Sequence, residues 1–318
     1  MEKTEQAIRD YIKSAAGGYD IDDGTKIFIG KFREIYGSNL RAVIYYGSRL
    51  IEGMAKPSSF RDFFVIVEKY QPLARDWFDR LTLDFMPPKM WFLSLQIDGI
   101  KQDTKYHVVT LSDFKKYCSQ NAPDHYVIGR MSKRVAVAWA DEETTRVELL
   151  ESIANAFIVN ARSAVPLIAA PLSFKDAIKH FLQMSYRCEL RLETPEKIGA
   201  LYRTSKGYYD SLYGMLFELF VKEGVLLKSD EGYLPAASES GKAFRAKLYV
   251  IKSKARHIMR FPFMIKNMDN WLEQLLGKYE RTYGKPLVLT ESERRHKLTT
   301  AVKYFYKIKV APKIFRGR

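Results

Sequence analysis

Hydrophobic and polar positions along the first half of the chain follow two different periods. Apolar residues recur at helical spacing in three segments, 5–14, 25–37 and 147–161. Short apolar runs bounded by turn residues predict four strands, at Arg41–Tyr46, Asp62–Val67, Met90–Ile97 and Lys105–Leu111. The last two are expected to pair across a loop at Asp98–Thr104. This pattern predicts an α+β domain over residues 1–165.

The pattern changes over residues 166–240, where helices are followed by a hairpin. Ser173 is expected to cap a helix that runs to Ser185, and a second helix, rich in Tyr, Leu and Phe, is expected at Lys206–Glu223. The sequence that follows reads as two short strands closed around Asp230-Glu231-Gly232. This order of elements suggests a winged-helix domain, a module that binds DNA in some proteins and packs on other domains in others.

Residues 241–318 form a strongly basic third region. Lys242–Lys266 holds eight Lys and Arg residues and no acid, and Arg294–Arg318 holds nine and no acid, interleaved with aromatic and aliphatic residues. An amphipathic helix is expected between them, at Asn267–Tyr283. Three interpretations of the basic tail remain open: a nucleic-acid contact, an anionic membrane contact and a helix packed on the body.

Composition narrows the possible classes of protein. The chain has 318 residues, 47% of them hydrophobic, so it can bury a core, and its net charge of +15 favours an acidic partner. Two distant cysteines, Cys118 and Cys188, cannot form a disulfide framework, which fits a reducing compartment. The N-terminus has no apolar signal region, and the longest uncharged apolar stretch, Ser163–Phe174, is too short to span a bilayer. Membrane contact is therefore expected to be peripheral.

The segment VIYYGSRLIEGMAKPSSFRDFFVIVEKY, residues 43–70, carries the most specific chemistry. A strand ends in Gly47-Ser48, and after a loop the next strand opens with Asp62. A Gly-Ser turn can offer backbone N–H groups and a hydroxyl to phosphate oxygens. A carboxylate beside it can hold the Mg²⁺ that bridges those phosphates. The pair predicts transfer of a nucleotidyl group.

One feature of the usual pattern is missing. Polymerase-beta-type sites carry two carboxylates that alternate on one strand, whereas Phe64 stands at the second position here. Glu68 lies too far along the strand to replace it, and Asp98 and Asp103 are the remaining candidates in this domain.

A basic segment, His125–Val135, brings Arg130, Lys133 and Arg134 together just after a glycine. It is either a phosphate clamp or a solvated basic loop, and composition favours the loop. The five histidines show no metal-ligand spacing and are expected at the surface or half-buried.

Five segments in the same order as in a known family give a remote resemblance over most of the chain. They are YYGSRL, RDFFVIVEKY, TKYHVVTLSDF, HYVIGRMSKRV and MSYRCELRLETPEKI. They resemble motifs of the mitochondrial-type CDP-diacylglycerol synthases, also described as translocator assembly and maintenance proteins. Two departures stand out: Arg49 replaces a glycine of the family, and Cys188-Glu189 replaces Gly-Asp.

The resemblance implies a polymerase-beta-like nucleotidyltransferase domain, a winged-helix domain and a basic, helical C-terminal segment over residues 241–318 that contacts a membrane. It implies a Mg²⁺-dependent phosphatidate cytidylyltransferase that makes CDP-diacylglycerol from CTP and phosphatidate. Asp62 and Glu189 would be the catalytic and metal-binding acids. Nucleotide-binding residues would be Gly47, Ser48, Arg49, Lys105, Tyr126, Gly129, Arg130 and Lys133. Substrate contact or closure would involve Ser185, Tyr186 and Arg191.

The expected location is the cytoplasmic face of a prokaryotic inner membrane, with the matrix side of the mitochondrial inner membrane as the alternative. Two other functions stay open. One is a nucleotidyltransferase acting on RNA, protein or another small acceptor. The other is a non-enzymatic winged-helix protein that binds nucleic acid; the apolar face of 206–223 argues against it.

Overall fold

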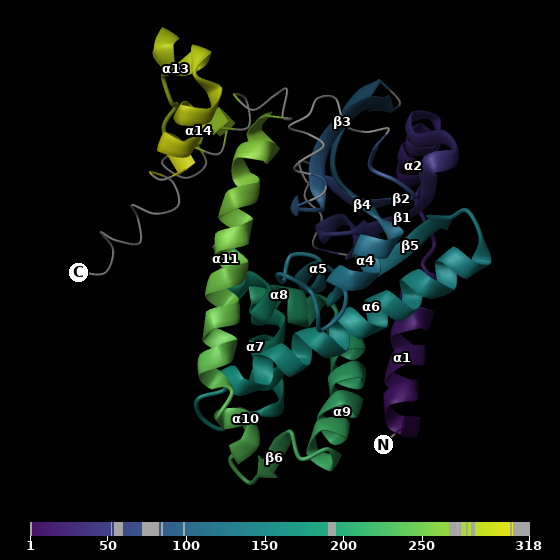
Figure 1. Cartoon of the computed structure of the whole chain (residues 1–318), viewed down its shortest axis with the longest axis vertical. Coiled ribbons are helices and arrows are strands. Elements are labelled where there is room, and N and C mark those ends of the chain that lie inside the picture. Colours follow the sequence, from purple (N-terminus) through teal and green to yellow (C-terminus); the bar gives the residue numbers. More distant parts are fainter. Residues whose placement is uncertain are drawn as a thin grey trace.

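The protein is an α+β structure in which a mixed five-stranded sheet is surrounded by helices (Figure 1). The computed structural model describes residues 2–51, 60–71, 85–97, 99–189, 195–266 and 284–305, together with a few single residues between and after these ranges. The fold class expected from the sequence is confirmed at this level.

The sheet has the strand order β3-β4-β2-β1-β5. Its strands are β1 (Leu40–Tyr46), β2 (Arg61–Val67), β3 (Lys89–Ile97), β4 (Ile100–Thr110) and β5 (Val135–Ala140). The pair β2/β4 is parallel and the other neighbours are antiparallel. The end of β1 and the start of β2 are paired, Tyr46 with Asp62, so the predicted phosphate turn and the predicted metal ligand share one edge.

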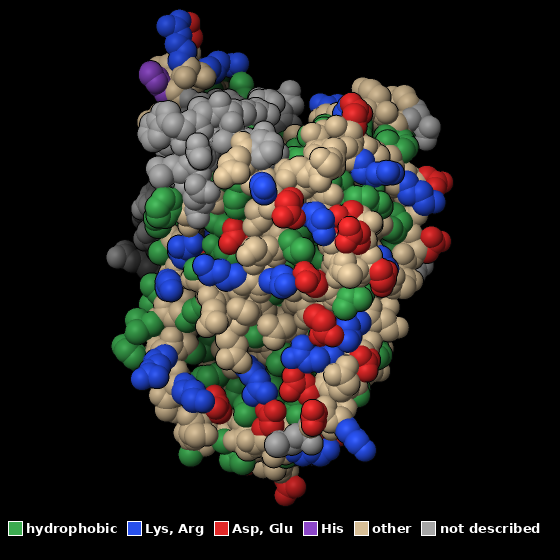
Figure 2. Space-filling model, turned by 45° about the vertical axis from the view of Figure 1, so that its right-hand side comes forward, with side chains coloured by type: hydrophobic (Ala, Val, Ile, Leu, Met, Phe, Trp, Pro, Cys, Tyr) green, Lys and Arg blue, Asp and Glu red, His purple; other side chains and the backbone are tan. Residues whose placement is uncertain are grey.

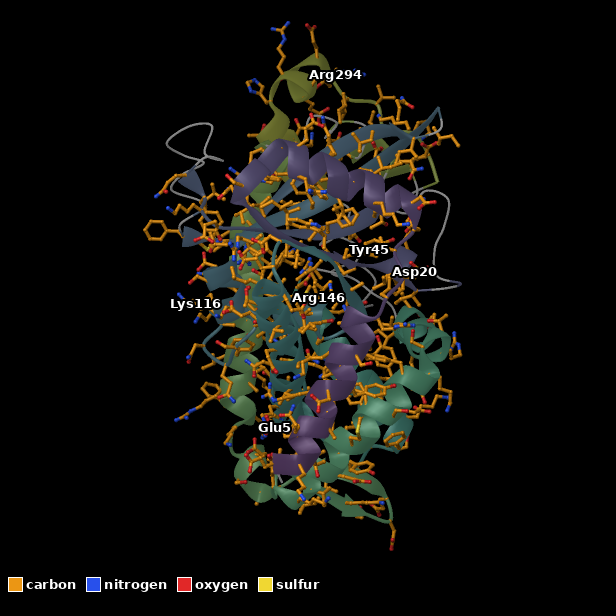
Figure 3. All side chains as sticks on the ribbon, turned by 90° about the vertical axis from the view of Figure 1, so that its right-hand side faces the viewer. Glu5, Asp20, Tyr45, Lys116, Arg146 and Arg294 are labelled. Atoms are coloured by element: carbon orange, nitrogen blue, oxygen red, sulfur yellow. The ribbon has the colours of Figure 1, made fainter. Side chains whose placement is uncertain are left out.

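Helices cover both faces of this sheet. Helix α2 (Asp23–Tyr36) lies along one face of the sheet, the face that buries Tyr45 (Figure 3). It packs Phe28 and Phe32 against this face, together with Phe63. Helices α1 (Glu2–Gly17) and α6 (Glu143–Ala164) belong to the core of the opposite face, which includes Phe64. Because side chains alternate along a strand, Asp62 and Phe64 both point toward this second face.

The remaining helices extend the second core below the sheet (Figure 1). They are α4 (Leu111–Tyr117), α5 (Ile128–Met131), α7 (Phe174–Arg187), α8 (Pro195–Thr204) and α9 (Lys206–Lys222). After them come the hairpin β6 (Leu226–Ser229) and β7 (Gly232–Pro235), then α10 (Ala237–Ser240), α11 (Ala243–Lys266), α13 (Glu291–Arg295) and α14 (Lys297–Phe305). One continuous cluster of buried side chains joins the sheet face to α6, α7 and α9.

Most elements predicted from periodicity are present. The expected cap is confirmed, since the Ser173 side chain accepts a hydrogen bond from the Asp176 amide at the start of α7. The predicted loop Asp98–Thr104 is wrong in extent: β4 begins at Ile100, and Ile97 pairs with Ile100, because β-branched and polar residues continue the ladder there. Helices α4 and α8 have no counterpart among the predictions, whereas α11 lies in the region 241–318 that was expected to be helical. Much of the predicted helix Asn267–Tyr283 lies outside the described residues.

The surface does not concentrate one sign of charge on the face shown in Figure 2, where Lys, Arg, Asp and Glu are interspersed. Cys118 and Cys188 are both buried free thiols. Within the described part of the chain, every helix is too short or too polar to cross a bilayer.

Candidate functional site

A tight turn connects the end of β1 to the acidic start of β2. Gly47 has a φ of 101°, a backbone conformation that favours glycine. A Cβ added at Gly47 would lie 2.5 Å from Asp62 Oδ2. Ser48–Leu50 then forms one 3₁₀ turn, in which the Leu50 amide donates to the Gly47 carbonyl at 3.2 Å. The structure therefore brings Gly47 and Asp62 together, as predicted, and shows why a side chain does not fit between them.

The carboxylate of Asp62 faces a lysine from the neighbouring strand. Lys105 is the cross-strand partner of Asp62 on β4, and its Nζ lies 3.1 Å from Asp62 Oδ1. The two side chains are 26% and 15% exposed, so the pair is reachable from solvent. Two residues predicted for metal and nucleotide binding thus neutralise one another in this structure.

The position of the missing second carboxylate is filled by aromatic rings. Phe64 and His107 are cross-strand partners, 0% and 1% exposed, and their rings stack with centroids 4.9 Å apart. His107 also joins two tyrosines: its Nδ1 lies 2.9 Å from the Tyr46 hydroxyl and its Nε2 lies 2.7 Å from the Tyr126 hydroxyl. This buried chain of polar groups links β1, β4 and the segment before α5.

Of the two candidates for the second carboxylate, Asp98 and Asp103, the structure describes Asp103, which is engaged by β3. Asp103 pairs with Ser94 across β3 and β4, and its carboxylate accepts a hydrogen bond from the Ser94 hydroxyl. Glu68 follows the far end of β2, where Arg41 Nε lies 3.7 Å from its Oε2. Asp98 is outside the described residues.

The predicted basic segment is a buried helical turn around Arg130. A Cβ at Gly129 would lie 2.7 Å from Cβ of Ser185, so this glycine lets α5 approach α7 closely. Ser185 is 2% exposed and donates to the Leu182 carbonyl, which makes it a packing residue between these helices in this state. The interpretation of this segment as a solvated loop is wrong for Arg130, which is 5% exposed, because apolar neighbours carry it into the core.

Arg130 forms a buried two-point ion pair with Glu189. Its Nη1 donates to Glu189 Oε1 at 2.6 Å and its Nη2 donates to Oε2 at 3.3 Å. Burial by itself would lower the pKa of the guanidinium, but the facing carboxylate outweighs burial and raises it, so Arg130 remains charged. Sequence reasoning placed Glu189 on the metal; in this structure both of its carboxylate oxygens face Arg130.

The ring of Tyr126 collects cationic side chains from two elements. The Arg130 guanidinium carbon lies 3.6 Å from its centroid, and that of Arg260, on α11, lies 4.8 Å away. Asp124 holds α11 at this point by accepting from Arg256 Nε and Arg260 Nη2, both at 2.8 Å. Burial opposes ionisation of Asp124, but the Arg260 and Arg256 charges outweigh it and lower the pKa of the carboxyl group.

Two further predicted residues meet at the end of α7. Lys133 Nζ lies 3.9 Å above the Tyr186 ring, a cation–π contact between the α5 segment and α7. Ser48 and Arg49 are both half-buried, in the turn that follows Gly47. Arg191 lies outside the described residues.

Sequence reasoning missed Tyr46, His107, Asp124 and Arg260. The histidines were expected near the surface, yet His107 and His125 are 1% and 0% exposed. The alternation of β4 gave a usable signal for His107, because it stands two residues after Lys105 and so shares its side of the strand. Arg260 gave no such signal, since its approach depends on how α11 packs.

The described residues suit a single divalent cation that is held by one carboxylate and by substrate phosphates. They do not form a cluster of several protein ligands. Among the residues that the structure describes, no group of three or more His, Cys, Asp or Glu side chains is arranged around a common point for a metal. Mg²⁺ is commonly held by one or two carboxylates together with substrate phosphates, and Asp62 meets that minimum. The amine of Lys105 is mobile enough to give way to a cation at Asp62.

A comparison with models of protein families finds no match, and a comparison with curated protein sequences finds no similar protein.

Proposed function

We propose that the protein is a Mg²⁺-dependent nucleotidyltransferase that transfers a cytidylyl group from CTP to phosphatidate and releases pyrophosphate. The observation that carries the transferase part is the packing of Gly47 directly against Asp62, with Lys105 as the third member. A turn with a glycine-only conformation, a carboxylate and an ammonium within a few ångströms of one another suit a metal-bound triphosphate.

In this proposal the chain acts mainly by positioning and by neutralising charge. The Gly47-Ser48 turn donates to phosphate oxygens, and Asp62 holds Mg²⁺, which would supply charge neutralisation at the transferred phosphoryl group. Lys105 and Lys133 add positive charge around the phosphates. Arg130 would join them if the triphosphate displaced Glu189, which would then be available as the further acidic group that the resemblance implies.

The lipid acceptor is supported by the outer face of α11. Five apolar side chains on it are exposed: Phe244, Leu248, Ile251, Ile258 and Met259, at 70%, 48%, 62%, 51% and 54%. Successive positions in the series Phe244, Leu248, Ile251, Ala255 and Ile258 are separated by alternately four and three residues. This spacing places them on one side of the helix. No acid occurs between Lys242 and Lys266, and exposed basic residues flank the apolar stripe. An apolar face with basic flanks suits the interface of an anionic bilayer.

The same helix places its inner face at the candidate site. Arg256 and Arg260 bind Asp124, and Arg260 approaches the Tyr126 ring, as described above. A membrane bound along the outer face of α11 would therefore lie one helix diameter from residues proposed to bind the nucleotide, about 10 Å. This arrangement favours an acceptor that stays in the bilayer.

Nucleic acid is the less favoured partner. The aromatic face of α9 is buried in the core, with Tyr209, Leu212 and Phe220 all 0% exposed, so it cannot enter a DNA groove. Transfer to RNA, protein or another small acceptor remains the second candidate, because it would use the same Gly47, Asp62 and Lys105 arrangement.

The test is release of pyrophosphate with Mg²⁺ and each of the four nucleoside triphosphates, with and without phosphatidate in anionic vesicles. Release that needs both CTP and phosphatidate supports the proposal. Release with another nucleotide, or without lipid, would keep the transferase and remove the proposed substrates. If folded protein released no pyrophosphate in any combination, the enzymatic proposal would be overturned.

A further inference from the structure

Among the described residues, Asp62 is the carboxylate of the sheet that lies against the Gly47 turn. Two cross-strand pairs stand next to this turn on the same side of β2 and β4: Asp62 with Lys105, and Phe64 with His107. Asp103 shares this side of β4 two residues before Lys105, but its carboxylate accepts a hydrogen bond from Ser94 on β3. The first pair contributes one acid and one base, so its net charge is zero. The second pair is a stack of two rings with almost no exposure.

The described residues around Asp62 offer a second divalent cation neither a further carboxylate ligand nor charge balance. Two-metal sites hold their ions about 3.5–4 Å apart and use carboxylates to offset the added charge. The Lys105 ammonium lies 3.1 Å from Asp62 Oδ1, so its positive charge repels a second cation beside this carboxylate. On the other side of Asp62, the Phe64 ring has no ligand atom. Both ring nitrogens of His107 are engaged by the hydroxyls of Tyr46 and Tyr126.

We propose that the Lys105 ammonium takes the place of the second divalent cation, so that the protein works with a single metal ion. This inference rests on the proposed function. Lys105 is a compact, mobile charge with three donors, whose side chain is 26% exposed. On loading, the metal ion and Lys105 compete for Asp62; the metal keeps the carboxylate, and Lys105 turns to a triphosphate oxygen. The protein then supplies, from its own side chain, the positive charge that a second bound metal ion supplies in two-metal enzymes.

The number of bound ions tests this directly, without reference to turnover. Protein-bound Mn²⁺ is counted by electron paramagnetic resonance after removal of free ligand, at saturating concentrations of a CTP analogue that cannot be cleaved. We expect one Mn²⁺ per chain for the wild type and for Lys105→Arg, which keeps the charge. For Lys105→Glu we expect two, because a second carboxylate then faces Asp62 across the strands, with Cβ atoms about 5 Å apart.

The outcomes separate this inference from the proposed function. A wild-type count of two would overturn the inference and leave the transferase in place. A count of one in Lys105→Glu, for protein whose unfolding temperature shows that it is folded, would also overturn it, because Lys105 would then not set the number of ions. A wild-type count of zero would remove the proposed function, and the inference with it.

Discussion

Asp62 and Lys105 are partners on parallel strands, and their charged atoms lie 3.1 Å apart. Neighbouring parallel strands place side chains of equal register next to each other, so this ion pair follows from the sheet and not from a flexible loop. Because both side chains retain some exposure, the pair itself is worth at most about 1 kcal/mol to stability. Its significance is that it holds a candidate metal ligand and a candidate phosphate ligand at one point.

Replacing Asp62 should therefore affect activity far more than stability. We expect Asp62→Asn to lower nucleotidyl transfer at least about 100-fold, because loss of a metal-bound charge interaction of several kcal/mol corresponds to two or more factors of ten. The unfolding free energy should change by less than about 1 kcal/mol. Steady-state pyrophosphate release and thermal unfolding measure the two effects. Asp103→Asn is the matched control, since Asp103 is bound by Ser94 and should retain activity; equal losses in both variants would contradict the assignment.

Gly47 should tolerate no side chain, for two reasons that can be separated. Its φ of 101° disfavours other residues, and a Cβ would lie 2.5 Å from Asp62 Oδ2. We expect Gly47→Ala to cost about 1–3 kcal/mol of stability and to abolish activity by displacing Asp62. Gly99→Ala is the control, because Gly99 has a φ of 74° but no atom within 4 Å of an added Cβ. That variant should lose stability by backbone strain alone and keep its activity; loss of activity there would show that the contact with Asp62 is not what matters.

The buried pair Arg130–Glu189 should behave differently from an exposed one. We expect Arg130→Ala to lower the unfolding free energy by about 3–5 kcal/mol, because it leaves an uncompensated carboxylate 3% exposed in the core. The double variant Arg130→Met with Glu189→Leu should be more stable than either single variant, since it removes both charges. Denaturant unfolding measures this, and Arg9→Ala is the comparison, because its pair with Glu5 is 23% and 35% exposed and should cost about 0.5 kcal/mol or less. If the double variant lost as much unfolding free energy as the two single variants added together, the two charges would not depend on each other for stability.

Acid should destabilise the protein through a histidine that is buried uncharged. Burial lowers the pKa of His125 to about 4, and its Nε2 lies 2.8 Å from Asn160 Oδ1. Between pH 6.5 and 4 the unfolded chain binds a proton at His125 that the folded chain excludes, so stability falls as pH falls through this window. The contribution is at most about 3 kcal/mol, and His180, whose pKa burial also lowers to about 4, acts in the same direction.

The midpoint temperature of unfolding should accordingly decrease as the pH is lowered from 7 to 4.5. The variant His125→Gln should lose part of this pH dependence. His296→Gln serves as the comparison because His296 is exposed. A pH profile that is the same in His125→Gln and in the wild type would contradict this origin.

The sequence predicted the parts of this site that lie on regular strands. The juxtaposition of Gly47 and Asp62 was predicted from a strand–turn–strand pattern. The alternation of side chains along each strand and the glycine at the turn define this local geometry, and both are visible in the sequence itself. The burial of Arg130 was not predictable in the same way, because a run of Arg and Lys is usually solvated. Its position depends on Gly129 approaching Ser185, a contact between segments 56 residues apart in sequence. The sequence led to the expectation of a helical, membrane-contacting segment over residues 241–318, but it did not predict that the inner face of α11 reaches Asp124 and Tyr126.

The exposed stripe of α11 yields the last prediction. Placing a charge in it should weaken binding to anionic vesicles without disturbing the inner face that binds Asp124. Ile251 is 62% exposed, and burying such a side chain in the bilayer interface is worth about 1.5–3 kcal/mol, so Ile251→Glu should lower vesicle affinity about 10-fold or more. Flotation with vesicles that contain phosphatidate measures the affinity, and Ile27→Glu on α2, where Ile27 is 45% exposed, is the matched control. Because the flanking residues are basic, raising the salt concentration should weaken the wild-type interaction further. Equal flotation of Ile251→Glu and the wild type would place the membrane contact elsewhere, and the lipid acceptor would then lose the support that α11 provides.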